Sequence, residues 1–179
     1  MYIGLQDLEL RPVHFDVNIP PDQIHFDSKI KQSSDLHAKG SAQLLNRSLG
    51  EIRMQGELRV EIEGVCDRCA EPAKQAVENR FDLLYVPAEE AASGGEDEID
   101  QAGTEVGYYE GNGIELNEVL REVVLLALPM QMVCMDECRG VCPVCGQNQN
   151  QGDCVCEPES ADDRWSKLKA LRAEIEPLK

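Results

Sequence analysis

Six cysteines lie within one short stretch of the chain and give it its clearest chemistry. They are Cys134, Cys138, Cys142, Cys145, Cys154 and Cys156. Thiolates bind zinc at about 2.3 Å, and a pair two residues apart, as in Cys142-Pro-Val-Cys145-Gly146, can place both sulfurs on one ion when the turn between them is tight. The spacing predicts a metal site in residues 134–156 that includes Cys142 and Cys145.

A closed zinc site needs four ligands. The second pair can come from Cys134 and Cys138, from Cys154 and Cys156, or one from each, and the spacing leaves these alternatives open. A catalytic zinc would keep an open position beside a general base, usually with histidine or carboxylate ligands, whereas the last histidine here is His37. We therefore expect one zinc with a structural role.

Cys66 and Cys69 form a further pair with two residues between them. A lone pair supplies half a zinc site, so three interpretations stay open: reduced thiols packed at a turn, ligands of a second metal with the spare tail thiols, or a redox disulfide. The even cysteine count also permits a disulfide framework. The N-terminal residues lack the basic flank and apolar run of a signal peptide, which favours metal binding and predicts cytoplasmic residence.

The elements that must position these thiols follow from the hydrophobic pattern. Alternation predicts a half-buried strand over residues 5–17, a hairpin over 36–65 that turns at 46–50, and a strand over 76–86. Residues 20–34 are expected to form a loop, and the pair Cys66 and Cys69 falls in a connection between strands. Residues 106–109 are expected to return to the sheet.

Two helices are predicted from apolar residues at steps of three and four. The first begins with Asn117 as its N-cap, ends before Pro129 and packs on the dry face of the sheet. The second follows Ser160 and carries the only tryptophan, Trp165, beside a small basic cluster of Lys167, Lys169 and Arg172 that is a candidate partner-binding site.

These elements predict an α+β protein with an N-terminal antiparallel sheet, or a partial β-barrel, covered by a helix and followed by a small zinc-binding module. The expected domains are residues 1–130, with an acidic loop at about 87–104, and residues 131–179, the cysteine-rich tail with its terminal helix. No run approaches 18 apolar residues, so we expect no membrane span.

The charge is −17 at pH 7, from 17 basic and 34 acidic residues, and residues 86–133 hold eleven of the acids against one base. Such a chain is at a disadvantage for binding phosphates and better suited to basic protein partners. Phosphate-binding loops and nucleophile motifs are absent from the sequence, and the acidic residues show no catalytic spacing, so we expect no enzymatic activity.

Four separated segments occur in an order that resembles the bacterial YceD family. They are Cys66-Asp-Arg-Cys69-Ala-Glu-Pro72, Tyr109-Glu-Gly-Asn-Gly-Ile-Glu-Leu116, Leu120-Arg-Glu-Val-Val-Leu-Leu-Ala-Leu-Pro129 and Cys138-Arg-Gly-Val-Cys142-Pro-Val-Cys145-Gly-Gln-Asn148. The resemblance covers about residues 1–172, although only some members carry the cysteine-rich tail. Ala70, Val141 and Gln149 depart from the usual residues, and none of these departures removes a candidate ligand.

The resemblance implies a non-enzymatic factor in ribosome biogenesis that supports the accumulation or processing of large-subunit ribosomal RNA. The acidic charge then suggests a basic ribosomal protein, or the pre-ribosomal large subunit, as the partner. Direct RNA binding is the rival, through Arg139, Arg164 and the basic cluster of the terminal helix, and its affinity would fall steeply with salt. A thiol redox protein or zinc-dependent regulator, in which Cys66 and Cys69 cycle, is the alternative from another class.

Overall fold

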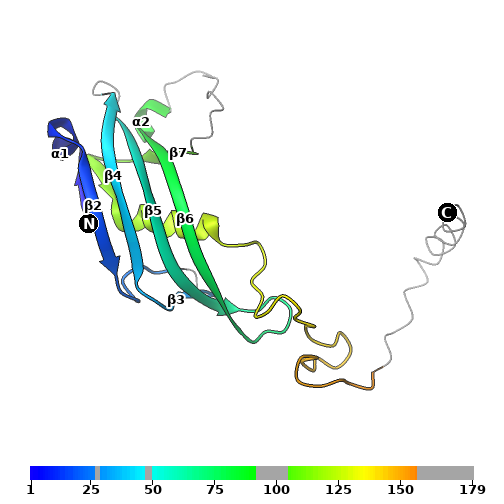
Figure 1. Cartoon of the computed structure of the whole chain (residues 1–179). Coiled ribbons are helices and arrows are strands. Elements are labelled where there is room, and N and C mark those ends of the chain that lie inside the picture. Colours follow the sequence, from blue (N-terminus) through cyan, green and yellow to red (C-terminus); the bar gives the residue numbers. More distant parts are fainter. Residues whose placement is uncertain (27–28, 47–49, 92–104, 157–179) are drawn as a thin grey trace, which may run out of the picture. The chain divides into compact units, whose positions relative to one another are not determined.

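Two long strands, Glu51–Val65 and Pro72–Pro87, pair with each other at the centre of the main sheet. The computed structural model describes residues 1–26, 29–46, 50–91 and 105–156 and shows a mixed α+β protein that is mostly sheet (Figure 1). The strands are β1 (Tyr2–Gly4), β2 (Val13–Ile19), β3 (Lys31–Gln32), β4 (Leu36–Asn46), β5 (Glu51–Val65), β6 (Pro72–Pro87), β7 (Glu105–Tyr109) and β8 (Gly113–Glu115). The helices are α1 (Leu5–Leu10), α2 (Ala88–Ala91) and α3 (Leu116–Ala127).

The main sheet has the strand order β2-β4-β5-β6-β7, with β3 paired to β5, while β1 and β8 form a separate antiparallel pair. The hairpin predicted over residues 36–65 is confirmed as β4 and β5, and the strand predicted over residues 76–86 is confirmed as β6. The expectation of a purely antiparallel sheet is wrong at one edge, because β7 runs parallel to β6. In the described part of the chain β2 and β7 remain the two edges, so the sheet is open rather than barrel-like.

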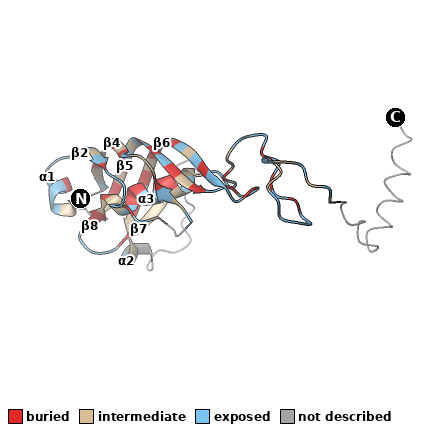
Figure 2. Cartoon of the chain, turned by 90° about the horizontal axis from the view of Figure 1, so that it is seen from below, coloured by how far each residue is buried: buried red, intermediate tan, exposed pale blue. Residues whose placement is uncertain are grey.

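One face of this sheet is dry because its strands alternate apolar and polar side chains. On β5 the inward residues Ile52, Met54, Leu58, Val60 and Ile62 are all buried. Helix α3 lies against this face, behind β4 to β6 in Figure 1, and both the helix and the strands carry buried residues, drawn red in Figure 2. The helix contributes Leu116, Val119, Leu120, Val123 and Val124, so the predicted packing of this helix is confirmed.

Two glycines sit where aromatic rings cross the dry face. Phe15, Gly40, Gly56 and Phe81 are consecutive partners in one row across β2, β4, β5 and β6. A Cβ at Gly40 would lie 2.6 Å from Phe15 Cζ, and one at Gly56 would lie 2.7 Å from Phe81 Cζ. A Cβ would also meet the backbone carbonyl oxygen of Gln55 at Gly40 and that of Lys39 at Gly56, so both positions need glycine because neighbouring backbone and buried rings occupy the space of a side chain.

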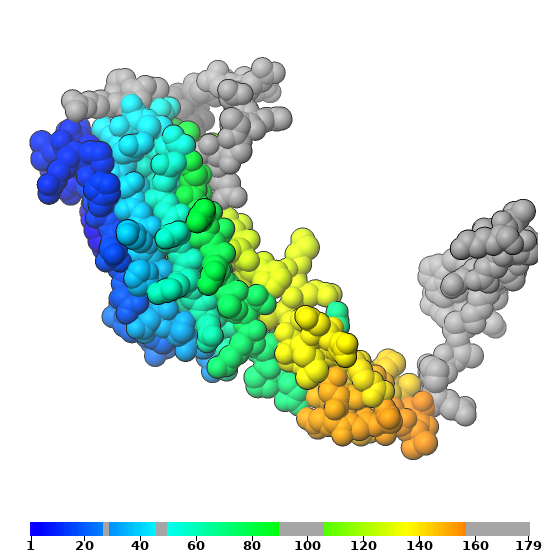
Figure 3. Space-filling view, in the orientation of Figure 1, coloured from blue at the N-terminus to red at the C-terminus, as the bar shows by residue number. Residues whose placement is uncertain are grey.

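The opposite face of the sheet, seen in Figure 3 over β4 to β6, is polar. The firmest pair on this face is Arg53 and Asp82, whose two hydrogen bonds measure 2.8 Å and 2.7 Å. Glu57 and Arg80 form a looser and more exposed pair at 3.7 Å, beside a hollow of about 560 Å³. These opposite charges face each other across strands, as a wet sheet face favours.

Two local predictions are wrong for physical reasons. Residues Leu5–Leu10 form α1 rather than a strand: Leu8 is buried while Leu10 is 84% exposed, so their alternation does not mark one face. Helix α3 begins at Leu116 with Glu115 as its N-cap, without a side-chain capping bond. Leu116 is the first residue of the helix, and its N–H donates to the Met1 carbonyl at 2.9 Å, so a distant partner satisfies this first donor.

The chain divides into two compact units, Met1–Asp67 with Glu71–Asp136, and Arg68–Ala70 with Glu137–Lys179. The predicted domain boundary at residue 130 stays a prediction. The predicted acidic loop lies mostly outside the described residues, and the predicted terminal helix, with Trp165, Lys167, Lys169 and Arg172, lies wholly outside them.

Candidate metal centres

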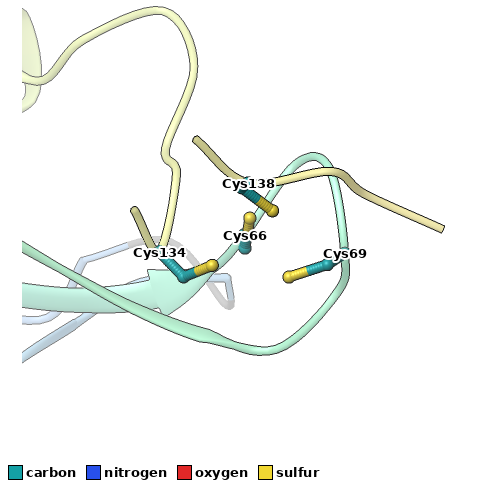
Figure 4. Close-up of side chains that lie close together, drawn as sticks. All are labelled: Cys66, Cys69, Cys134 and Cys138. Atoms are coloured by element: carbon teal, nitrogen blue, oxygen red, sulfur yellow. The ribbon is translucent and has the colours of Figure 1, made fainter. Parts of the chain in front are cut away.

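Four sulfur atoms from distant parts of the sequence lie close together. Cys66 and Cys69 follow β5, whereas Cys134 and Cys138 follow α3, and Figure 4 shows the four side chains pointing toward one another. All four sulfurs lie within 4.8 Å of one another. Three of these cysteines are buried and Cys134 is half-buried. We call this set cluster 1.

The connection between β5 and β6 presents the first pair of cluster 1. Pairing of the two strands reaches Val65 and Pro72, and the turn is closed by a hydrogen bond of 2.8 Å from the Cys66 N–H to the Glu71 carbonyl. Ala70 has a φ of 60°, a left-handed conformation that L residues with a side chain adopt at a cost. The long hairpin thus ends in a tight turn that holds Cys66 and Cys69.

Asp67 ties this connection to the chain that leads into Cys134. Its N–H donates to the Met132 carbonyl at 2.8 Å, and its carboxylate accepts the Met132 N–H at 2.6 Å. A residue inside the first cysteine pair therefore fixes the backbone two residues before Cys134. Sequence reasoning missed Asp67, since its partner lies 65 residues away.

A second set of four sulfurs, cluster 2, also lies within 4.8 Å of one another and consists of Cys142, Cys145, Cys154 and Cys156. The Cys142–Cys145 turn is closed by hydrogen bonds from the Gly146 N–H to the Cys142 carbonyl and from the Cys142 N–H to the Gln147 carbonyl. Gly146 has a φ of 74°, and nothing lies within 4 Å of a Cβ built there, so the backbone conformation alone requires glycine.

The electrostatics of cluster 2 favour thiolate at its first ligand. The pKa of the Cys142 thiol is lowered to about 6, chiefly because the backbone N–H groups of Cys145 and Val144 donate to its sulfur. The pKa of the Cys156 thiol is raised to about 12, chiefly by its hydrogen bond with Cys145. Four sulfurs this close cannot all carry charge without a cation among them.

Both clusters fit a tetrahedral metal ion with four sulfur ligands. Zinc–sulfur bonds of about 2.3 Å place the sulfurs of a tetrahedral site roughly 3.8 Å apart, within the limit that both clusters meet. A tetrahedral set of four thiolates is typical of zinc or iron–sulfur sites. Each cluster offers the full ligand count of a closed site, and neither contains a histidine or carboxylate ligand.

The grouping is one of the alternatives that the sequence left open, and it is not the preferred one. The sequence favoured one zinc bound by four of the six tail cysteines, and it left open a second metal bound by Cys66 and Cys69 with the two spare tail thiols. The structure places Cys134 and Cys138 with that distant pair and leaves the other four as a set. A usable signal was present, since Cys66 and Cys69 repeat the two-residue spacing of Cys142 and Cys145.

Fold and ligands together define a sheet protein with two four-thiol centres. Residues 54–172 match the model of the family described as large ribosomal RNA subunit accumulation protein YceD. The matched range contains all eight cysteines, most of the β5–β6 hairpin and α3. The chain belongs to the YceD family.

Curated relatives agree with this assignment. The chain is 28% identical over 139 residues to the maize protein named large ribosomal RNA subunit accumulation protein YCED homolog 1, chloroplastic, with 65% of this chain and 47% of the maize protein covered. It is 26% identical over 151 residues to the Arabidopsis thaliana protein of the same name, covering 73% and 47% of the two chains. An uncharacterized protein of Mycobacterium tuberculosis is 30% identical over 121 residues, which cover 65% of this chain and 54% of the mycobacterial protein.

The chain spans about half the length of the curated relatives it matches. No solved structure matches it significantly. Among the described residues, the helices are all too short or too polar to cross a membrane.

Proposed function

We propose that this protein is a non-enzymatic factor that supports the accumulation of large-subunit ribosomal RNA. The observation that carries the proposal is the family match over residues 54–172, a family described by that role. The eight cysteines within this range are grouped as two ligand sets that consist of cysteine alone. This arrangement supports a structural use of the metal centres and a binding role for the chain.

The metal is zinc in this proposal, with one ion in each cluster. Structural zinc sites are closed by four protein ligands, and both clusters supply four thiolates. Zinc would hold segments that have few apolar residues of their own: of the described residues from 134 on, only Cys138 and Cys142 are buried apolar ones. Metal analysis separates zinc from iron, the other metal that four thiolates favour.

The proposed partner is a basic ribosomal protein, alone or in the pre-ribosomal large subunit. The charge of −17 and the eleven acids of residues 86–133 favour a cationic partner through long-range attraction. Direct RNA binding gains less support, because Arg139, the only described member of the proposed basic set, is paired with Asp153 at 2.6 Å. Cytoplasmic residence remains part of the proposal.

The proposed role is tested by complementation. In a bacterium that lacks its own family gene, expression of this chain is expected to restore the ratio of mature large-subunit to small-subunit ribosomal RNA. A chain with Cys69→Ser and Cys145→Ser, which removes one ligand from each cluster, is expected to restore it poorly. An unchanged ratio with the intact chain, present at normal abundance, would contradict the proposed function.

The partner is tested by affinity purification with a matched charge control. Glu96→Gln, Asp97→Asn, Glu98→Gln and Asp100→Asn remove four charges from the acidic segment. Asp7→Asn, Asp22→Asn, Glu61→Gln and Glu78→Gln remove four charges from exposed positions outside residues 86–133. We expect the first set to lose ribosomal proteins from the purified complex and the second to keep them. Recovery of RNA without ribosomal protein would favour direct RNA binding instead.

The redox alternative gains little support from the structure. Cys66 and Cys69 are 2% and 4% exposed, and both lie in a set of four sulfurs. A cycling pair must be reached by an oxidant or by another thiol, and buried thiols are generally inert. Rapid oxidation of these two thiols in the zinc-loaded protein, followed by a change in the ribosomal RNA ratio, would restore this alternative.

A further inference from the structure

Asn150 links a ligand of cluster 1 to the loop that carries cluster 2. Its Nδ2 donates to the Cys138 sulfur at 3.3 Å, and Cys138 is a member of cluster 1. The same Nδ2 donates to Asn148 Oδ1 at 2.9 Å, and the Asn150 N–H donates to that oxygen at 3.0 Å. Asn150 Oδ1 accepts the Arg139 N–H at 2.8 Å. The side-chain amide is thus fixed at both ends.

The loop that carries Asn150 belongs to the turn of cluster 2. Residues 139–142 lie antiparallel to residues 147–149. The Gln149 N–H donates to the Gly140 carbonyl at 2.9 Å, Val141 pairs with Asn148 as an isolated bridge, and the Cys142 N–H donates to the Gln147 carbonyl at 2.8 Å. This short ladder therefore runs from the first ligand of cluster 2 back toward Cys138.

A metal ion in cluster 2 would fix the Cys142–Cys145 turn, and with it the ladder and Asn150. An N–H that donates to a ligating thiolate offsets part of its charge and holds the sulfur lone pairs toward the metal. Conversely, an ion in cluster 1 would fix Cys138 and so order the loop from its other end. Coupling between two binding sites is reciprocal by thermodynamic necessity.

We propose that Asn150 is a positioning residue that couples the two metal centres, so that an ion in either cluster raises the affinity of the other. This inference rests on the proposed metal sites. It adds that the two sites fill cooperatively and that a side-chain amide contributes to the effect without a metal-bridging ligand. The Val141 N–H, which donates to the Arg68 carbonyl at 2.9 Å, is a second link between the ladder and the Cys66–Cys69 turn.

The test is a thermodynamic cycle on the full chain with zinc, measured by chelator competition. Three chains are compared: the intact chain, one with Cys66→Ser and Cys69→Ser, and one with Cys142→Ser and Cys145→Ser. The overall association constant for binding two zinc ions to the intact chain is divided by the product of the two association constants of the variants, each of which keeps one cluster and binds one ion. We expect a quotient of about 5 or more, the lower end of typical coupling between sites.

Asn150→Asp keeps the acceptor for the Arg139 N–H and removes the donor to Cys138. In this background the quotient is expected to fall toward 1, although the backbone bond from the Val141 N–H to the Arg68 carbonyl remains. Gln149→Glu is the matched control, because it makes the same change of amide to carboxylate one residue away, where only the backbone N–H bonds to the ladder. The control is expected to keep the coupling.

The outcomes separate the two proposals. Two ions bound with a quotient near 1 in the intact chain, or a quotient that Asn150→Asp leaves unchanged, would overturn the coupling while leaving the metal sites in place. A chain that binds no metal would overturn the metal sites themselves.

Discussion

Ala70 and Gly146 hold equivalent places in the two cysteine turns, each directly after the second thiol and each in the left-handed region, with φ of 60° and 74°. In the Cys142–Cys145 turn, which ends in this conformation, the N–H groups of Val144 and Cys145 donate to the first sulfur. One turn uses glycine, for which it costs nothing, and the other uses alanine, for which it costs about 1–2 kcal/mol.

Replacing Gly146 is therefore expected to weaken cluster 2. A β-branched residue, as in Gly146→Val, should cost about 1–2 kcal/mol and lower zinc affinity roughly 5- to 30-fold. Gly152→Ala is the control, because a Cβ there meets its nearest neighbour, Gln147 Nε2, at an ordinary 3.7 Å. Chelator competition measures both. Equal affinities for the two variants would show that the left-handed conformation is dispensable.

Metal stoichiometry tests the division into two clusters. We expect about two zinc ions per chain purified under reducing conditions, falling to about one in Cys69→Ser and to about one in Cys145→Ser. The double variant should bind almost none. If only four of the six tail cysteines bound one ion, as the spacing first suggested, Cys69→Ser would leave the zinc content unchanged, and the distant pair would have no ligand role.

Chelation is expected to loosen the cysteine segments and to spare the sheet. Closed zinc sites contribute folding energy to segments that lack a core, whereas β4, β5 and β6 bury an apolar face against α3. Hydrogen exchange read by peptide should show lost protection in residues 66–71 and 134–156 and unchanged protection in residues 52–62. Uniform loss across both regions would mean that the sheet also depends on the metal.

The Arg53–Asp82 pair predicts a small dependence of stability on pH. The two hydrogen bonds from Arg53 lower the pKa of Asp82. Its contribution is therefore present above the ordinary aspartate pKa and is lost as pH falls through the lowered value. Because both side chains are 37% exposed, Asp82→Asn should cost only about 0–1 kcal/mol at pH 7.

Urea unfolding measures this cost, which should vanish at pH values below the lowered pKa of Asp82. Glu57→Gln, which removes the looser pair with Arg80, is the control and should cost less. A cost for Asp82→Asn that persists in acid would assign the effect to lost packing rather than to charge.

Local pattern was enough to predict part of the fold. Alternation over β5 is regular because each inward residue meets the same apolar layer, and the Leu116–Ala127 stripe is regular for the same reason. The helix start was mispredicted because its first N–H is satisfied by Met1, more than a hundred residues away. Local sequence carries no signal for such a bond.

The candidate ligands were predicted from the sequence, whereas their grouping was left as a choice among alternatives. Spacing identifies which thiols can share an ion within one turn, as with Cys142 and Cys145. It cannot state that the end of the β5–β6 hairpin meets the chain after α3, which only the register of the sheet and the path of the helix decide. Asn150 was missed for a related reason, since an asparagine in a polar loop has many ordinary uses.

The parallel pairing of β6 with β7 places a condition on the acidic segment that joins them. Parallel neighbours cannot be joined by a tight turn, because the chain must return to the starting end of the first strand, and such a return takes a dozen or more residues. Residues 88–104 make this return. Substitutions in residues 88–104 leave the pairing of β6 with β7 possible, whereas a deletion that leaves fewer than about a dozen of them would detach β7 from the sheet.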